Sequence, residues 1–173
     1  MKNKKTVGYW SDSDFNENKK YWKNKTVGAN LKVRIENFKL LDKVLAEENI
    51  FYFLEGNTLN FIYTESRLDV DDHDDDVGIF VKDKEKLLSL EKKFNNLGFF
   101  IIRKNNDMVS VYREGRYIDI CIFKKSLFKI GYGKKYFQRK YFESFEKLEF
   151  EGIKFNIPKF TEEFIKVRYG KKS

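Results

Sequence analysis

Residues 69–81 read Asp-Val-Asp-Asp-His-Asp-Asp-Asp-Val-Gly-Ile-Phe-Val, so six aspartates lie within eight positions directly before an apolar segment. Carboxylates this close together repel one another unless a cation lies among their oxygens. A strand that begins inside the run would hold these charges in place. The pattern therefore favours a bound divalent metal ion.

The spacing of the aspartates indicates which of them meet. Residues two apart on an extended strand project from the same face, so Asp72, Asp74 and Asp76 are expected to converge. Oxygen ligands without a nearby Cys favour Mg²⁺ or Mn²⁺ over zinc. Because Mg²⁺ is usually shared between a few carboxylates and substrate phosphates, the run predicts phosphate chemistry.

Two other interpretations of the acidic run stay open. A calcium loop of the EF-hand type shares its D-x-D-x-D opening, but Val77 stands where that loop needs Gly and Asp83 where it needs Glu. An unliganded, solvated acidic loop would rarely adjoin so apolar a strand. The metal site for phosphate chemistry is the favoured interpretation.

Composition predicts one folded domain. The chain has 173 residues, 41% of them hydrophobic and 17% aromatic, which is enough to bury a core. A polar N-terminal extension is expected at 1–28 and a single catalytic domain at 29–173. With no transmembrane or signal segment recognised, a cytoplasmic protein is expected. Cys121 is expected to be a buried packing residue, and His73, the single histidine, excludes mechanisms that need two.

The formal net charge of +8 predicts attraction to polyanions. Nucleotide-activated substrates, nucleic acid and peripheral contact with an anionic membrane all fit this charge. Lysines and aromatic residues interleave over 124–147, which is typical of single-stranded nucleic-acid binding. A partly buried segment with solvated charges is the favoured interpretation, so nucleic acid is not the expected partner.

Periodicity and turn residues predict an α/β or α+β domain with a mixed sheet flanked by helices. The expected helices are 31–45, a short one opening at 56–58, 84–97 ending at Gly98, and one from Thr161 to about Tyr169. The expected strands are 51–54, 76–81, 99–103, 108–113, 116–123 and a hairpin within 145–155.

Three segments resemble the LicD and fukutin-related phosphotransferases, which belong to the nucleotidyltransferase superfamily of DNA polymerase β type. They are F-Y-F-L-E-G-N-T-L at 51–59, D-H-D-D-D-V-G-I-F-V at 72–81 and Y-I-D-I-C-I-F at 117–123. The separation of the turn from the acidic cluster matches the family, as do Ile157-Pro158 and Tyr169-Gly170. The resemblance spans 31–170 and implies a nucleotidyltransferase-like fold.

The resemblance also implies roles for individual residues. Its metal-binding pair would be Asp74 and Asp76, with Asp72 as a further or supporting ligand. Asp119 would complete the metal site and accept the proton of the attacking hydroxyl. The phosphate side would consist of Gly56, Asn57 and Thr58, and Arg67 would supply the cation that the family carries at a position held here by Thr64.

The activity that the resemblance implies is a Mg²⁺- or Mn²⁺-dependent phosphotransfer. A phospho-alcohol such as phosphocholine, ribitol phosphate or glycerol phosphate would pass from a CDP-activated donor to a glycan hydroxyl. An alternative is adenylyl or cytidylyl transfer at the same aspartates, and another is a non-enzymatic nucleic-acid-binding module. Departures from the family at Asn57 and Thr64 also leave open an inactive member.

Overall fold

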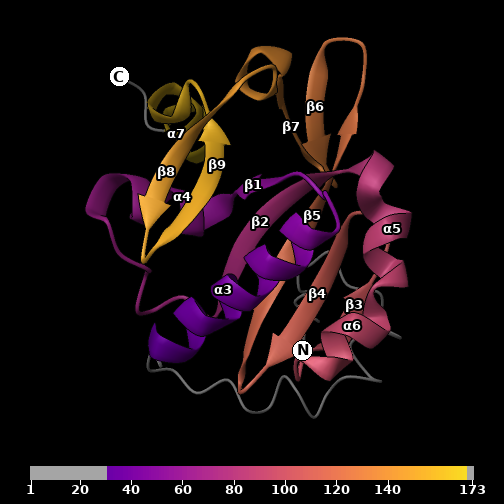
Figure 1. The fold of residues 1–173 in the computed structure, drawn as a ribbon. Coiled ribbons are helices and arrows are strands. Elements are labelled where there is room, and N and C mark those ends of the chain that lie inside the picture. The colour runs from indigo at the N-terminus through magenta and orange to yellow at the C-terminus, as the bar shows by residue number, and fades with distance from the viewer. Residues whose placement is uncertain (1–30, 171–173) are drawn as a thin grey trace, which may run out of the picture.

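The computed structural model describes residues 31–170, and the expected extension at 1–28 lies outside them. They form an α+β fold around a mixed sheet, shown in Figure 1, whose main path has the strand order β1-β2-β5-β4-β3. The strands of this path are β1 (Tyr52–Leu54), β2 (Asp74–Phe80), β5 (Arg116–Lys125), β4 (Met108–Arg113) and β3 (Phe100–Lys104).

One pair of neighbouring strands in this path is parallel. β2 runs parallel to β5, whereas β1–β2, β4–β5 and β3–β4 are antiparallel. Between β2 and β5 the chain passes through η1 (Val81–Asp83), α5 (Lys84–Ser89), α6 (Glu91–Asn96), β3 and β4. This crossover gives a parallel connection the length it requires.

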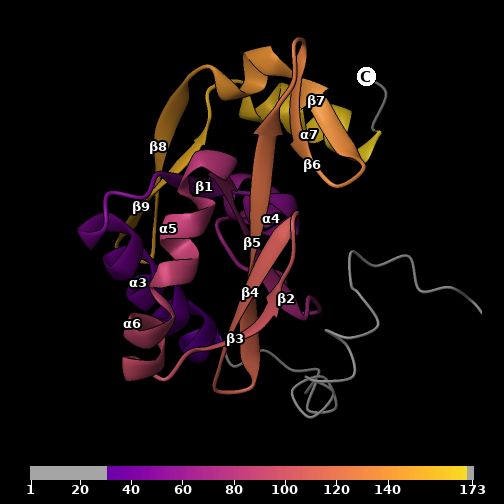
Figure 2. The ribbon, with the colours of Figure 1, turned by 90° about the vertical axis from the view of Figure 1, so that its right-hand side faces the viewer.

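Three helices lie on one side of the sheet. Figure 2 shows the sheet nearly edge-on, with α3 (Leu31–Glu47), α5 and α6 on the same side. α3 buries Phe38, Leu41 and Leu45, which recur at helical spacing. These side chains belong to one continuous apolar cluster that also contains the inward residues of β2, β4 and β5.

The C-terminal elements extend this framework. β6 (Lys129–Tyr132) pairs with the end of β5 and with β7 (Lys135–Gln138), and η2 (Arg139–Phe142) follows. The hairpin of β8 (Phe145–Phe150) and β9 (Ile153–Pro158) leads to α7 (Thr161–Tyr169). In Figure 1, α7 and the β6–β7 hairpin lie at the same end of the molecule.

Gly78 lets aromatic rings pack directly on the acidic strand. It pairs with Phe53 of β1, and a Cβ added at Gly78 would overlap the rings of Phe53 and Phe123. Phe53 also contacts Phe142 and Phe145, with ring centroids 5.7 and 5.2 Å away. The aromatic cluster therefore joins the C-terminal elements to β1 and β2.

Most predicted elements are confirmed, with three differences. β2 begins at Asp74, two residues earlier than expected. The helix expected over 84–97 is divided at Leu90, next to Ser89, whose hydroxyl donates to the Lys86 carbonyl and so competes with regular helical bonding. The hairpin β6–β7 was not predicted. Cys121 is buried as expected.

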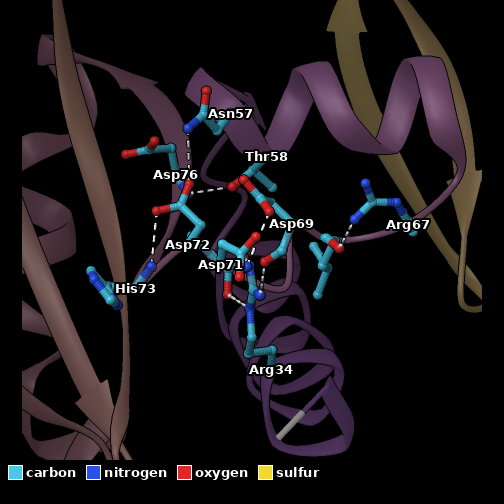
Figure 3. A network of polar contacts seen from close by, with 11 residues as sticks. Arg34, Asn57, Thr58, Arg67, Asp69, Asp71, Asp72, His73 and Asp76 are labelled. Carbon is cyan, nitrogen blue, oxygen red and sulfur yellow. Dashed lines mark hydrogen bonds and ion pairs between the residues drawn. The ribbon is translucent and has the colours of Figure 1, made fainter. Parts of the chain in front are cut away.

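The acidic strand is tied to α3 by a buried ion pair. Asp75 projects from the opposite face of β2 to its neighbours Asp74 and Asp76 and is 2% exposed. The Arg34 Nη2 and Nε atoms lie 2.6 and 3.0 Å from its two carboxylate oxygens. Arg34 also donates to the Asp69 carbonyl, so one guanidinium holds both the strand and the loop before it (Figure 3).

Within 31–170 no helix has the length and apolar character needed to cross a bilayer.

Replacing Arg34 with Met should lower the free energy of unfolding by about 3–5 kcal/mol, because Asp75 would remain buried without its partner. The double variant Arg34→Met/Asp75→Leu should recover much of this loss, since it removes both charges. Urea denaturation measures the difference, with Lys39→Met on the exposed face of α3 as the control. A loss below about 1 kcal/mol, the value of an exposed pair, would contradict the assignment.

Candidate metal centre and adjoining pocket

Three carboxylates from the two parallel strands face one another. The register places Asp76 of β2 directly opposite Asp119 of β5, and Asp74 lies two residues earlier on the same face as Asp76. One oxygen from each of the three carboxylates can be chosen so that all lie within 4.8 Å of one another. The structure thus brings together three of the four residues that the sequence assigned to a metal.

Asp72 lies beside this group and not in it. The rule that residues two apart on a strand share a face does not apply to Asp72, because β2 begins only at Asp74. Its carboxylate instead accepts from Asn57 Nδ2 at 3.1 Å and from the His73 backbone N–H at 2.9 Å, as Figure 3 shows. The Asp72 side chain also forms a hydrogen bond with Asp74, so Asp72 meets one member of the cluster but is not among the three carboxylates whose oxygens all lie within 4.8 Å of one another.

The protein makes ionisation of the cluster unfavourable in the absence of a cation. Burial, followed by the charge of Asp119 and a hydrogen bond with Asp72, raises the pKa of Asp74 to about 8. Burial and the charges of Asp74 and Asp119 raise the pKa of Asp76 well above its ordinary value. A divalent cation among these oxygens would offset the repulsion, so the donor set suits a hard metal ion.

Asp119 has polar support from the two strands beyond it. Ser110 of β4 pairs with Asp119 in register and donates its hydroxyl to Oδ1. Arg103 of β3 pairs with Ser110, and its Nη1 lies 3.4 Å from Asp119 Oδ2. Sequence reasoning missed both residues, although their strands were predicted, because the strand register was not.

The turn before α4 (Gly56–Glu65) brings the backbone close to Asp76. Gly56 has φ +61°, and a Cβ at this position would overlap the Asp76 carboxylate. The Asp76 N–H donates to Thr58 Oγ1 at 2.8 Å, which fixes α4 against β2 (Figure 3). Only a glycine fits this conformation and this approach without strain.

The predicted phosphate contact at Gly56 is partly taken by the protein itself. The Gly56 N–H donates to the carboxylate of Glu55, the fully buried residue before α4. This carboxylate also accepts from Arg168 Nη1 of α7, and Arg168 Nη2 lies 3.3 Å from the Tyr132 hydroxyl. A negative charge here suits the helix N-terminus.

Arg67 does not reach the cluster. Its guanidinium lies 2.6 Å from the Glu65 carboxylate on the exposed surface and stacks over the Phe61 ring, with 4.8 Å to the centroid. In Figure 3 it lies away from Asp76. The guanidinium that contacts the residue before α4 is that of Arg168, which donates to Glu55 and lies in a different part of the sequence.

A pocket of about 390 Å³ opens beside Asp76, between the start of α4, the β6–β7 turn and the end of α7. Asn57 joins the α4 and α7 walls of the pocket, because its Oδ1 accepts from the Tyr169 hydroxyl at 2.9 Å. Its Nδ2 donates to Asp72, which lies outside the lining. The residues that line the pocket are Gly56, Asn57, Asp76, Lys134, Lys135, Tyr136, Phe137, Arg168 and Tyr169.

Comparison with solved structures identifies the fold. The antibiotic-resistance factor ANT(2'')-Ia aligns over 74% of this chain and 66% of its own, with 11% identity and a TM-score of 0.54. The lincosamide antibiotic adenylyltransferase LnuA, bound to lincomycin, aligns over 75% of this chain and 82% of its own, with 17% identity and a TM-score of 0.49. The chain has a nucleotidyltransferase-like fold.

No family model and no curated protein matches the chain. Membership of the LicD family is therefore unsupported, while the broader nucleotidyltransferase resemblance is supported. The expected glycan acceptor is corrected as well, because the solved structure ANT(2'')-Ia, which shares the fold, is an antibiotic-resistance factor.

The metal-free protein should lose stability as the pH rises from 3.8 to about 8, the ordinary and raised pKa values of Asp74. In this window the Asp74 carboxyl is protonated in the folded state and ionised in the unfolded state, so its contribution to the free energy of unfolding falls as the pH rises. Asp74→Asn should flatten the fall, and Mg²⁺ should reduce it in the unsubstituted protein. Thermal unfolding in EDTA across the window measures this, and an identical slope in Asp74→Asn would contradict it.

Proposed function

We propose that the protein is a metal-dependent nucleotidyltransferase that moves a nucleotidyl group from a nucleoside triphosphate to a hydroxyl group of a small acceptor. The observation that carries this proposal is the in-register pairing of Asp76 with Asp119, which gathers three carboxylates beside a pocket. The nucleotidyltransferase-like fold supports this hypothesis over the phospho-alcohol transfer that the LicD resemblance implies.

Asp74, Asp76 and Asp119 would hold Mg²⁺ or Mn²⁺, in keeping with their oxygen donors and with the charge repulsion among them. A divalent ion at such a site would supply Lewis-acid stabilisation of phosphate oxygens. Asp72 would help to orient the Asp74 carboxylate through their hydrogen bond, and it would contact Asn57 at the same time.

The chain's own residues would orient the reacting groups. Gly56 has no side chain and so leaves room for the Asp76 carboxylate. The Thr58 hydroxyl accepts a hydrogen bond from the Asp76 backbone N–H and so fixes its position. During transfer the acceptor oxygen would bond to the α-phosphorus, and the bond from that phosphorus to the bridging oxygen of pyrophosphate would break. Asp119, oriented by Ser110 and Arg103, is our candidate to take the hydroxyl proton.

Asp76→Asn and Asp119→Asn should each reduce metal-dependent turnover by about 10²–10⁴-fold, the range for loss of a group that acts in the transition state. Pyrophosphate release from a panel of nucleoside triphosphates and small alcohols measures turnover, and electron paramagnetic resonance measures Mn²⁺ binding. Asp71→Asn is the matched control, since Asp71 is exposed and lies outside the cluster. Full activity in either cluster variant would refute the site.

Arg67→Ala should retain turnover within about twofold, because the Arg67 guanidinium pairs with Glu65 at an exposed site and such pairs contribute little. The same pyrophosphate assay tests this expectation. A large rise in KM for the nucleotide with kcat unchanged would contradict this expectation. It would indicate that Arg67 binds the phosphate groups, as the family resemblance implied.

A further inference from the structure

Glu55 is a buried carboxylate beside the candidate metal centre. It precedes α4 directly and has 0% exposure. Its backbone N–H donates to the Asp76 carbonyl at 3.2 Å, which ties it to β2. One of its carboxylate oxygens accepts from the Gly56 N–H, and a Cβ at Gly56 would overlap the carboxylate of Asp76. The side chains of Glu55 and Asp76 therefore both lie against one glycine.

A guanidinium from the C-terminal helix neutralises Glu55. Arg168 Nη1 donates to the other Glu55 carboxylate oxygen, and Arg168 Nη2 lies 3.3 Å from the hydroxyl of the buried Tyr132. Among residues 31–170 the carboxylate paired with Arg168 is that of Glu55 and not that of Asp76. A buried ion pair is often no more stabilising than a well-packed apolar pair, so stability alone does not account for these two charges.

Arg168 also lies near Asp76. Both side chains line the pocket beside α4. Burial and the neighbouring carboxylates raise the pKa of Asp76, whereas the positive charge of Arg168 acts to lower it. An arginine side chain is long, and its planar fork matches the two oxygens of a carboxylate. A guanidinium bound to Asp76 would occupy oxygens that a metal ion needs.

We infer that Glu55 is a positioning residue, which retains Arg168 through their ion pair and thereby keeps the Asp76 carboxylate available to a divalent cation. Removal of the Glu55 charge would release the guanidinium, and Asp76 would become its partner. The inference rests on the metal site of the proposed function, but it concerns binding of the ion and not the transfer step. Glu55 acts through Arg168 and does not contact the ion.

Binding of Mn²⁺ to the full chain, followed by electron paramagnetic resonance, tests this role. Glu55→Gln should weaken Mn²⁺ binding by about tenfold or more, the scale for residues that orient metal ligands. The introduced amide oxygen still accepts from the Gly56 N–H, but the charge that retains Arg168 is gone. Glu55→Gln/Arg168→Gln should recover most of the lost affinity, because the competing guanidinium is removed. A merely structural role of Glu55 predicts no such recovery.

Glu162→Gln is the matched control. Glu162 pairs with Lys166 at 2.7 Å on the exposed surface of α7, so this substitution also releases a cation on that helix, and Mn²⁺ affinity should stay unchanged. Circular dichroism checks that each variant is folded. If Glu55→Gln does not fold, Glu55→Asp replaces it, because this change keeps the buried charge but shortens its reach. Glu55→Asp should show a smaller loss of affinity, which Arg168→Gln again recovers.

A crystal structure of metal-free Glu55→Gln gives a second, direct measurement. In it the Arg168 guanidinium should be hydrogen-bonded to the Asp76 carboxylate. If Arg168 instead stays with Tyr132 and the side chain at position 55 while Mn²⁺ affinity falls, charge acting at a distance explains the loss and the inference is overturned. Equal Mn²⁺ affinity in Glu55→Gln and the unsubstituted protein, or no recovery in the double variant, would overturn it as well.

Turnover separates this inference from the proposed function. If the variants follow the expected pattern of Mn²⁺ binding while the unsubstituted protein releases no pyrophosphate with any acceptor, the role of Glu55 stands and the transferase proposal fails. If pyrophosphate is released and Glu55→Gln binds Mn²⁺ as tightly as the unsubstituted protein, the Glu55 assignment fails alone. Absence of Mn²⁺ binding in the unsubstituted protein would overturn both.

Discussion

The parallel pairing of β2 with β5 is the constraint on which the site depends. Its register places Asp76 opposite Asp119, and a slip of one residue would turn every β2 side chain to the other face. Asp75 resists such a slip, because its carboxylate is bound to Arg34 on the side of α3. The acidic strand therefore uses its two faces differently. One charge is neutralised within the protein, and the others are left facing a space that suits a metal ion.

The end of α7 stabilises the opposite border of the site. Its consecutive residues Arg168 and Tyr169 contact Glu55 and Asn57, which stand on either side of Gly56. Gly56 in turn lies against the Asp76 carboxylate. Two contacts across more than 110 residues of sequence thus hold one turn in place. The C-terminal helix belongs to the architecture of the site as much as the acidic strand does.

Local pattern predicted the central part of this arrangement. Alternation along a strand placed Asp74 and Asp76 on one face, whereas Asp119 was assigned through the family resemblance. The rule held only in part for Asp72, which meets Asp74 through a hydrogen bond but lies before β2 begins, because strand boundaries depend on pairing partners. Arg67 was chosen for its nearness in sequence, whereas Arg168 is near only in space. Its partner Glu55 lies 113 positions away, which periodicity cannot detect.

The missed hairpin β6–β7 shows what charge patterning alone leaves undecided. Its lysines are spread along the sequence as they would be on a nucleic-acid-binding surface, but the hairpin, closely packed at Gly131, places Lys134 and Lys135 at the pocket beside Asp76. An acidic cluster that favours a cation and a basic turn that favours an anion then border one pocket. Under the proposed function, a metal-bound polyphosphate would satisfy both requirements, because its cation would meet the carboxylates while its free oxygens would meet the lysines. The formal net charge of +8 thus says less about the ligand than the arrangement of charge at the pocket, where carboxylates lie on one side and lysines on the other.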